Sequence, residues 1–416
     1  ENTIAFDILK LHNDRNCIVI LNSEELQLLD LRSLEFEKIT DINSIYLQDK
    51  PQFVAKKTLV KDLNGDGLDD IILPDFKEVH LLLQQKDSLN KFTLSTLPVN
   101  AVVDMNTSQI SFSEQKYFIQ DINFDGLNDF LFVKDGKLNF FNQKELGQFS
   151  EVAQILELPF DFSGLPWWLK RGADGETADQ SNLKHSMLEG IQDINGDGIL
   201  DIMVKKTESS GVLDREISYD FFYGYDKAGT LSFNKEPDTH ISAEGTLSNL
   251  KLIDMNQDNK MEILVSSFDI GVSQIIGALL SGSIDQDVFI FSLDNKDKYG
   301  EEPIFEEEVS LSFSLSSGQS GQPVIMTVDS DGNKQKDIIL SVGEKRLNVF
   351  HGLEKNEESD EMFNSRFKRH RTKLPADGNM IVASDLNQDG KDELIIRYGK
   401  QDDAELKNKI VILTAK

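Results

Sequence analysis

The stretch "DLNGDGLDDIILP" (residues 62–74) joins a polar segment of nine residues to a short apolar run. Asp62, Asn64 and Asp66 alternate in the polar segment, and Asp70 occupies its ninth position. Asp, Asn and Gly favour turns, and a short run of Ile and Leu that ends at a turn residue is typical of a buried strand. The stretch therefore predicts a tight β-turn that gathers oxygen-bearing side chains immediately before a strand.

The same pattern recurs along the chain. Near copies are "DINFDGLND" (121–129), "DINGDGILD" (193–201) and "DLNQDGKDE" (385–393), and looser copies are "DMNQDNKME" (254–262) and "DSDGNKQKD" (329–337). The six copies begin 59, 72, 61, 75 and 56 residues apart, and each precedes an apolar run such as "FLFV" or "IILS". A third alternating run usually follows, as in "KEVHLLLQQ", and then a fourth, as in "KFTLSTL" or "LSFNKE".

Four strands that recur at this interval predict an all-β chain in which each repeat is one four-stranded antiparallel blade of a β-propeller. Residues 1–40 add one blade whose turn lacks the alternating acids, so the prediction is a single seven-bladed domain over residues 1–416. The last blade ends before a fourth strand, and the N-terminal strand is expected to close the ring. The blades are expected near residues 1–45, 50–100, 110–158, 186–236, 248–313, 322–374 and 379–416.

Alternating carboxylates and amides suit a hard cation such as Ca²⁺, which takes six to eight oxygen ligands in proteins. In each loop we expect ligands at positions 1, 3, 5 and 9 and the main-chain carbonyl at position 7. These residues are Asp62, Asn64, Asp66, Leu68 and Asp70; Asp121, Asn123, Asp125, Leu127 and Asp129; Asp193, Asn195, Asp197, Ile199 and Asp201; Asp254, Asn256, Asp258, Lys260 and Glu262; Asp329, Asp331, Asn333, Gln335 and Asp337; and Asp385, Asn387, Asp389, Lys391 and Glu393. A structural alternative stays open, since the same residue types favour hairpin turns without any ion.

Other calcium loops do not match. An EF-hand needs a glutamate at position 12, where the first three loops have Leu73, Phe132 and Val204. The segments "DLNGDGLDDIIL", "DINFDGLNDFLF", "DINGDGILDIMV" and "DLNQDGKDELII" resemble the FG-GAP (integrin α-type) repeats of the bacterial, VCBS-like kind. The resemblance covers nearly the whole chain. It implies a seven-bladed β-propeller with Ca²⁺ in six hairpins, and an exported protein that binds or adheres. The Phe-Gly and Gly-Ala-Pro landmarks of that family are missing, and "RGAD" (171–174) is not an Arg-Gly-Asp adhesion signal.

The composition excludes several classes of binding partner. A formal charge of −29 argues against nucleic acid or an anionic membrane. No apolar stretch is long enough for a membrane helix, and the single cysteine, Cys17, excludes an intrachain disulfide. The chain begins at Glu1, which favours a processed N-terminus and an exported protein: secreted, periplasmic or on the surface of a bacterial cell.

Long connections are expected at the end of each blade opposite the calcium loop, within residues 161–186, 207–215, 236–248 and 269–286. Long loops on a rigid scaffold commonly carry function. Trp167 and Trp168 in the first of these, with Arg171, are candidate ligand-binding residues for a protein or a glycan, or else they anchor the loop. The segment "GVSQIIGALLSGS" (271–283) is expected to cover a central channel, and the basic run "RFKRHRTK" (366–373) to form an outer strand.

An enzymatic alternative uses the same end of the blades. His185, His240, Arg171 and Tyr225 are the side chains from which a polysaccharide lyase would be assembled, although nothing in the sequence brings them together. The six histidines show no metal-ligand spacing. His80 and His351 lie in predicted third strands, where packing explains them.

Overall fold

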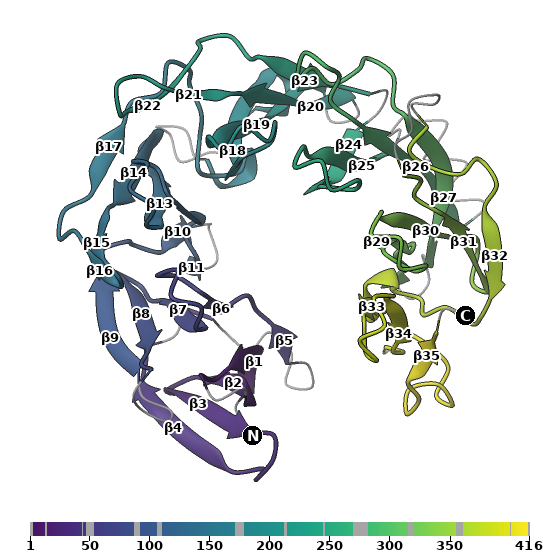
Figure 1. Cartoon of the computed structure of the whole chain (residues 1–416), viewed down its shortest axis with the longest axis horizontal. Helices are drawn as coiled ribbons and strands as arrows, with labels where there is room; N and C mark the ends of the chain where they lie inside the picture. The colour runs from purple at the N-terminus through teal and green to yellow at the C-terminus, as the bar shows by residue number, and fades with distance from the viewer. Residues whose placement is uncertain are drawn as a thin grey trace. The chain divides into compact units, whose positions relative to one another are not determined.

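The computed structural model describes residues 3–414 apart from 13–14, 44, 47–53, 87–91, 106–109, 171–178, 212–213, 244–245, 269–281, 315–318, 355–360 and 400. These residues form β-strands and three short 3₁₀ helices (Figure 1). The chain divides into two compact units. Unit 1 comprises Glu1–Thr177 and Tyr225–Phe233, and unit 2 comprises Ala178–Gly224 and Asn234–Lys416.

Unit 1 contains three main sheets. The first has the order β4-β3-β2-β1-β5, the second β6-β7-β8-β9 and the third β12-β13-β14-β17. Their strands are β1 Thr3–Lys10, β2 Asn16–Asn22, β3 Glu25–Asp30, β4 Phe36–Asp41, β5 Ala55–Lys56, β6 Val60–Lys61, β7 Asp70–Pro74, β8 Val79–Gln84, β9 Phe92–Leu97, β12 Tyr117–Gln120, β13 Asp129–Lys134, β14 Lys137–Phe141 and β17 Gln154–Leu156. The two-stranded ribbons are β10 Val102–Met105 with β11 Ile110–Ser113, β15 Gln143–Glu145 with β16 Gln148–Phe149, and β21 Gly224–Asp226 with β22 Leu231–Phe233.

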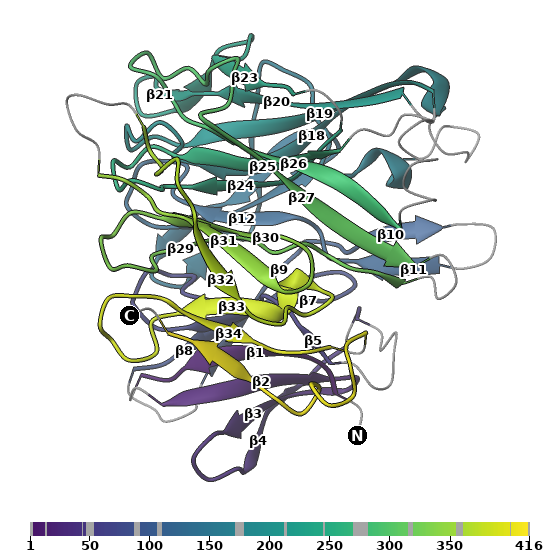
Figure 2. The ribbon, with the colours of Figure 1, turned by 90° about the vertical axis from the view of Figure 1, so that its right-hand side faces the viewer.

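Unit 2 contains one large sheet and two smaller ones. The large sheet has the order β18-β19-β20-β24-β25-β26-β27-β28, with β23 also paired to β20. Its strands are β18 Leu183–Gln192, β19 Asp201–Gly211, β20 Asp214–Phe222, β23 Thr239–Ile241, β24 Thr246–Ile253, β25 Glu262–Phe268, β26 Ser283–Phe291, β27 Phe305–Ser314 and β28 Gln319–Ser320 (Figure 2). The smaller sheets are β29 Ile325–Val328, β30 Asp337–Ser341, β31 Arg346–Phe350 and β32 Lys368–Arg371, and then β33 Ile381–Ser384, β34 Glu393–Ile396 and β35 Val411–Leu413.

Eight of the nine strands of the large sheet form two antiparallel groups of four, and β28 extends the second group beyond β27. One group is β18, β19, β20 and β23, and the other is β24 to β27. A single parallel pair, Ile217 with Thr246, joins them. Apart from this pair and the short parallel pairing of β1 with β5, the strand pairs described are antiparallel. The coarse prediction of an all-β chain built from four-stranded antiparallel sheets is therefore confirmed.

The cores lie between sheets that follow one another in the chain. Ile72 and Leu81 of the second sheet pack with Phe130, Phe132 and Phe141 of the third. In unit 2, residues of β25 and β26 pack with residues of β30 and β31 in the same way. The strand after each acidic loop is buried on both faces, as in β7 and β30, where all five residues are buried. This burial explains why these strands read as continuous apolar runs.

Two predictions about individual segments are wrong. Residues 208–211 and 214–215 are strand and not loop, because they continue β19 and β20 toward the tip of their hairpin, where Thr207 and Ser209 are buried on one face. The run "LSFNKE" does not supply the fourth strand of its sheet. Leu231–Phe233 instead pairs with β21 in a separate ribbon, and β23 is the outer strand.

Three other segments can be compared with the sequence predictions. The basic run lies on β32, an exposed outer strand, as expected. The last sheet has three strands among the described residues, which also agrees with the sequence. The N-terminal strand β1 pairs with β2 and β5 in the first sheet. Ring closure, the seven blades and the single domain stay predictions.

Candidate metal-binding loops

The six acidic loops share one backbone conformation. Positions 4 and 6 have positive φ in every loop, at Gly65 and Gly67, Phe124 and Gly126, Gly196 and Gly198, Gln257 and Asn259, Gly332 and Lys334, and Gln388 and Gly390. Glycine adopts this region freely, and other residues adopt it at a cost. The two looser copies at Asp254 and Asp329 therefore form the same turn, even though Asn259 and Lys334 replace the glycine at position 6.

The four oxygen-bearing side chains also make the same hydrogen bonds in every loop. The side chain at position 1 accepts from the N–H of position 6, position 3 from position 5, and position 5 from position 7, while position 9 accepts from the N–H of position 2. In the first loop these are the bonds from Gly67 to Asp62 (2.9 Å), Asp66 to Asn64 (3.0 Å), Leu68 to Asp66 (2.9 Å) and Leu63 to Asp70 (3.1 Å).

The fifth loop keeps these bonds although its residue types are reordered. Asp331 accepts from Asn333 at 3.2 Å, and Asn333 accepts from Gln335 at 2.8 Å. A carboxylate and an amide therefore exchange positions without changing the turn. The hydrogen bonds from the backbone to these side chains require an oxygen at each position. They do not require that the side chain carries a negative charge.

The acid at position 9 is buried in every loop, with at most 2% of its surface exposed at Asp70, Asp129, Asp201, Glu262, Asp337 and Glu393. In four loops its second oxygen accepts a main-chain N–H at or just past the end of the third strand, from Gln84, Gln143, Gly224 or Gly352. Burial, with a smaller contribution from the neighbouring charges of Asp66 and Asp62, raises the pKa of Asp70 to about 6, against the lowering effect of the N–H groups of Gln84 and Leu63. Burial likewise raises the pKa of Asp201 and of Glu262 to about 7.

Burial is the largest cause of these pKa shifts, and the charges of the other acids in the same loop add to it. The Oδ1 atom of Asp254 is buried and accepts no hydrogen bond from the described residues. Every donor atom in the set is an oxygen, and hard divalent cations prefer carboxylate and carbonyl oxygens. The residues present therefore fit a calcium ion, held by positions 1, 3, 5 and 9 with the carbonyl of position 7.

The loops of unit 2 contact one another through their backbones. Met261 donates its N–H to Ile194 O (2.9 Å), Lys336 to Met255 O (2.8 Å) and Asp392 to Asp329 O (2.7 Å). Each bond joins position 8 of one loop to position 1 or 2 of the loop before. The approach is close, because a Cβ atom on Gly196 would lie 2.8 Å from Asn259 O. The loops that begin at Asp193, Asp254, Asp329 and Asp385 thus form one connected row.

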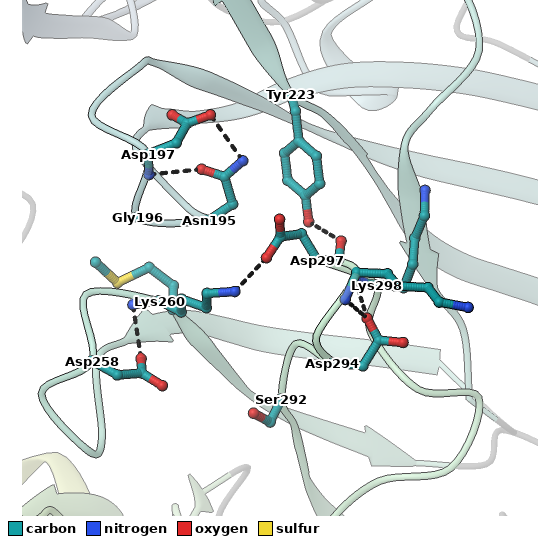
Figure 3. Close-up of polar contacts among 12 residues, drawn as sticks. Asn195, Gly196, Asp197, Tyr223, Asp258, Lys260, Ser292, Asp294, Asp297 and Lys298 are labelled. Carbon is teal, nitrogen blue, oxygen red and sulfur yellow. Dashed lines mark hydrogen bonds and ion pairs between the residues drawn. The ribbon is translucent and has the colours of Figure 1, made fainter.

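Figure 3 shows the first two loops of this row, which begin at Asp193 and Asp254 and are the third and fourth loops of the chain. The amide of Asn195 donates to Asp197, and the N–H of Lys260 donates to Asp258 at 2.9 Å. The Nζ atom of Lys260 points away from its own loop and pairs with Asp297, whose carbonyl accepts from the Tyr223 hydroxyl at 2.7 Å. The lysine at position 7 of the fourth loop is therefore neutralised by a residue outside the loop.

A second feature, in unit 1, was not predicted from the sequence. A cavity of about 510 Å³ is lined by Lys56, Lys57, Thr58, Leu59, Lys61, Ile72, Glu114, Gln115, Lys116 and Tyr117. Lys57 also lies over the ring of Tyr46, 4.9 Å from its centre, and the Tyr46 hydroxyl donates to Glu114 at 2.6 Å. Four lysines around one cavity are unusual in a chain with a net charge of −29. The lysines come from two segments far apart in sequence.

The candidate tryptophans lie on the 3₁₀ helix η1 (Trp167–Leu169), which contains no buried residue. Their rings meet edge to face with centres 5.6 Å apart, and Trp168 is 54% exposed. Arg171 and most of the segment "GVSQIIGALLSGS" lie outside the described residues. His185 on β18 and His240 on β23 are separated by two strands of one sheet, at least about 14 Å across at the usual strand spacing, so the fold does not bring these two together.

No family model matches the chain, and no curated protein matches it. Among solved structures, similarity is found to an Agrocybe aegerita lectin described in the specific recognition of non-reducing terminal N-acetylglucosamine, with TM-score 0.45, 13% identity and coverage of 88% of this chain and 80% of the lectin. The N-terminal part of BBS1, in complex with ARL6, gives TM-score 0.38, 10% identity and coverage of 100% and 93%. Hsv2 of Kluyveromyces lactis gives 0.32, 8%, 84% and 73%. At these scores the similarities carry no argument about fold or function. Among the residues described, no helix is long and apolar enough to cross a membrane.

Proposed function

We propose that this chain is a seven-bladed β-propeller of the FG-GAP type, stabilised by up to six calcium ions, and that it acts outside the cytoplasm as a binding module. One observation carries the proposal: six loops place three acids and one amide on the same turn and use them in the same hydrogen bonds. Turn formation needs only an oxygen at each position, so the constant count of three acids calls for a separate explanation. A divalent cation supplies it.

The substitution Asp125→Asn separates the ion from the turn. Asn333 at the same position of the fifth loop accepts the N–H of position 7, as Asp125 does from Leu127 at 2.9 Å. The variant therefore keeps the turn and loses one negative charge and one carboxylate ligand. We expect it to melt like the wild type in a calcium chelator and below the wild type in millimolar calcium.

The matched control is Glu151→Gln, which removes one exposed acid of unit 1 outside the loops. It should follow the wild type in both conditions. If Asp125→Asn and the wild type melt together with and without calcium, the loops are turns and the calcium proposal fails. Elemental analysis of calcium-saturated protein gives an independent count, which should not exceed six ions per chain.

The lining of the unit 1 cavity supports an anionic ligand for the binding module. Four lysines line the cavity of unit 1 within a strongly acidic molecule, and a lysine ammonium donates hydrogen bonds but accepts none. Thr58, Gln115 and Tyr117 add hydroxyl and amide groups to the lining. Its one carboxylate, Glu114, accepts the hydrogen bond of the Tyr46 hydroxyl, and Leu59 and Ile72 complete the lining. Carboxylated glycans combine anionic groups with hydroxyls, so an acidic glycan is the carbohydrate partner that this cavity fits.

Titration calorimetry with an oligogalacturonate, and with a neutral galactan of equal length, tests this second proposal. The acidic chain should bind and the neutral one should not. The variant Lys56→Ala/Lys57→Ala should weaken binding at least about tenfold, because hydrogen bonds to charged groups contribute about 1.5–3 kcal/mol each. Lys227→Ala, at an exposed turn residue, is the control. Equal binding of both glycans, or no effect of the double variant, rejects the cavity as the site.

A further inference from the structure

The turn between β7 and β8 brings together three side chains that the calcium loops do not use. Asp75 and Glu78 flank the turn residues Phe76 and Lys77, and the Asp75 N–H donates to Glu78 O at 2.8 Å. The next pair of the hairpin is Pro74 with Val79. Cross-strand partners face the same side of a hairpin, and so do residues two apart on a strand. The sequence D-x-x-E-x-H therefore directs Asp75, Glu78 and His80 to one side.

The distances among these groups match a metal site better than a hydrogen bond. His80 Nε2 lies 3.4 Å from Asp75 Oδ2 and 3.2 Å from Glu78 Oε1, and one ligand atom from each residue lies within 4.8 Å of the others. A charge-assisted hydrogen bond would be about 2.7–2.9 Å long. A tetrahedral zinc ion bound at 2.0–2.1 Å holds its ligand atoms about 3.3–3.4 Å apart.

The imidazole nitrogen at the centre of this group has no hydrogen bond. His80 Nε2 is buried and forms none with the described residues, although both carboxylates lie beside it. A buried polar atom without a partner is costly. Its lone pair or its proton is aligned with neither carboxylate, whereas a cation between the three groups would satisfy all of them.

The two carboxylates are oriented toward His80 and have no lysine or arginine partner among the described residues. Asp75 Oδ1 accepts the Phe76 N–H at 2.6 Å, which leaves Oδ2 toward His80. No lysine or arginine in the described part of the chain forms an ion pair with Asp75 or Glu78. The Glu78 side chain is 43% exposed, so an ion has a path of entry, while Asp75 and His80 are largely covered.

We propose that Asp75, Glu78 and His80 bind a divalent transition-metal ion of the zinc class. An imidazole nitrogen with two carboxylates selects Zn²⁺ or Co²⁺ over Ca²⁺, which takes oxygen ligands. Three protein ligands leave a fourth position for water or for a group from a bound molecule. The site lies at the opposite end of β7 from the loop of residues 62–70, and Asp75 is about 17 Å along the chain from Asp70 at the usual rise per residue.

The test is calorimetric titration of the full chain with Zn²⁺ in excess calcium, with Co²⁺ absorption as a second readout. A second trio, Asp331, Asp337 and His351, shares its acids with the fifth calcium loop, so the titration uses the His351→Gln variant as the parent. The parent should bind one equivalent of Zn²⁺. Adding His80→Gln should abolish this binding. Adding Glu78→Gln should weaken the affinity for Zn²⁺ at least about tenfold, because even the loss of a residue that only hydrogen-bonds to a metal ligand weakens metal affinity about 10–100-fold.

The exposed His370 provides the control, because His370→Gln changes an imidazole outside the trio. It should leave the stoichiometry at one. Absence of zinc binding by the parent overturns the proposal, and so does unchanged binding after His80→Gln. Since Glu78 is partly exposed, Glu78→Gln is expected to fold normally, and it keeps the test decisive if the His80 variant unfolds.

Discussion

The two ends of strand β7 carry clustered acids in different ways. At its start, Asp70 closes a loop whose side chains each accept a backbone N–H, and the whole arrangement recurs six times in the chain. At its end, Asp75 and Glu78 meet His80 in a turn that is not repeated at the other five loops. The first cluster consists of oxygens within nine consecutive residues, and the second needs a nitrogen from across a hairpin. Repetition reveals the first in sequence, and only the register of two strands reveals the second.

The largest expected effect is that of removing calcium. A ligand that binds only the folded state stabilises it by about 1.4 kcal/mol per site when its free concentration is ten times Kd, and up to six sites contribute. A calcium-selective chelator should therefore lower Tm strongly in a thermal scan. Zinc removal should lower it far less, because one site is involved. If calcium removal and zinc removal lower Tm equally, the six loops do not stabilise the fold more than the single site at the other end of β7.

The next effect compares the two ends directly by Asp70→Ala and Asp75→Ala. Asp70 is fully buried and accepts from Leu63 and Gln84, so its removal leaves two buried N–H groups without an acceptor. This should lower the free energy of unfolding by about 2–4 kcal/mol, even without calcium. Asp75→Ala loses the bond from Phe76 near the surface and should cost about 1 kcal/mol. Urea unfolding in chelator measures both, and a larger cost at Asp75 would reverse the assignment of a structural role to Asp70.

A smaller effect tests whether the looser loops carry strain. Lys334 has φ 69° at a position where four of the six loops have glycine. Lys334→Gly should raise the free energy of unfolding by up to about 1 kcal/mol, since the left-handed conformation costs about 1–2 kcal/mol for other residues and glycine returns part of this as entropy of the unfolded chain. Gly198→Ala in the third loop is the reciprocal variant and should destabilise. A destabilised Lys334→Gly would show that the lysine side chain is needed there.

The smallest effect concerns the tryptophans, which belong to neither end of β7. Trp168 is 54% exposed and η1 has no buried residue, so Trp168→Ala should change the free energy of unfolding by less than about 0.5 kcal/mol. If the pair is a binding hot spot, Trp167→Ala/Trp168→Ala should cost at least about 2 kcal/mol of affinity for the native partner. Early melting with unchanged binding would instead identify the pair as an anchor for its loop.

Features within one repeat could be predicted from sequence. The acid loops, the buried strands after them and the outer strand at Lys368–Arg371 follow from local alternation and apolar runs. Residues 208–211 resemble a loop in the sequence because Glu208, Ser209 and Ser210 are polar, while the strand pairing that orders them is made with residues 214–216 across the hairpin. The lysine-lined cavity combines residues 56–61 with 114–117, and the His80 trio depends on a two-residue turn. The cavity depends on the distance between two segments and the trio on the register of one hairpin, and the amino-acid composition contains neither.

The row of backbone bonds through Met261, Lys336 and Asp392 has a consequence for how unit 2 opens. Each of these amides is held by the carbonyl of a residue in the preceding loop, so it is released only when that contact separates. Local opening in proteins proceeds in contiguous cooperative segments. The three amides should therefore exchange their hydrogens with solvent at a common rate, and ion loss from the Asp254 loop should speed exchange at Lys336 as well as at Met261. The four acidic loops of unit 2 would then open together as one cooperative segment, and the backbone bonds between them would share one lifetime.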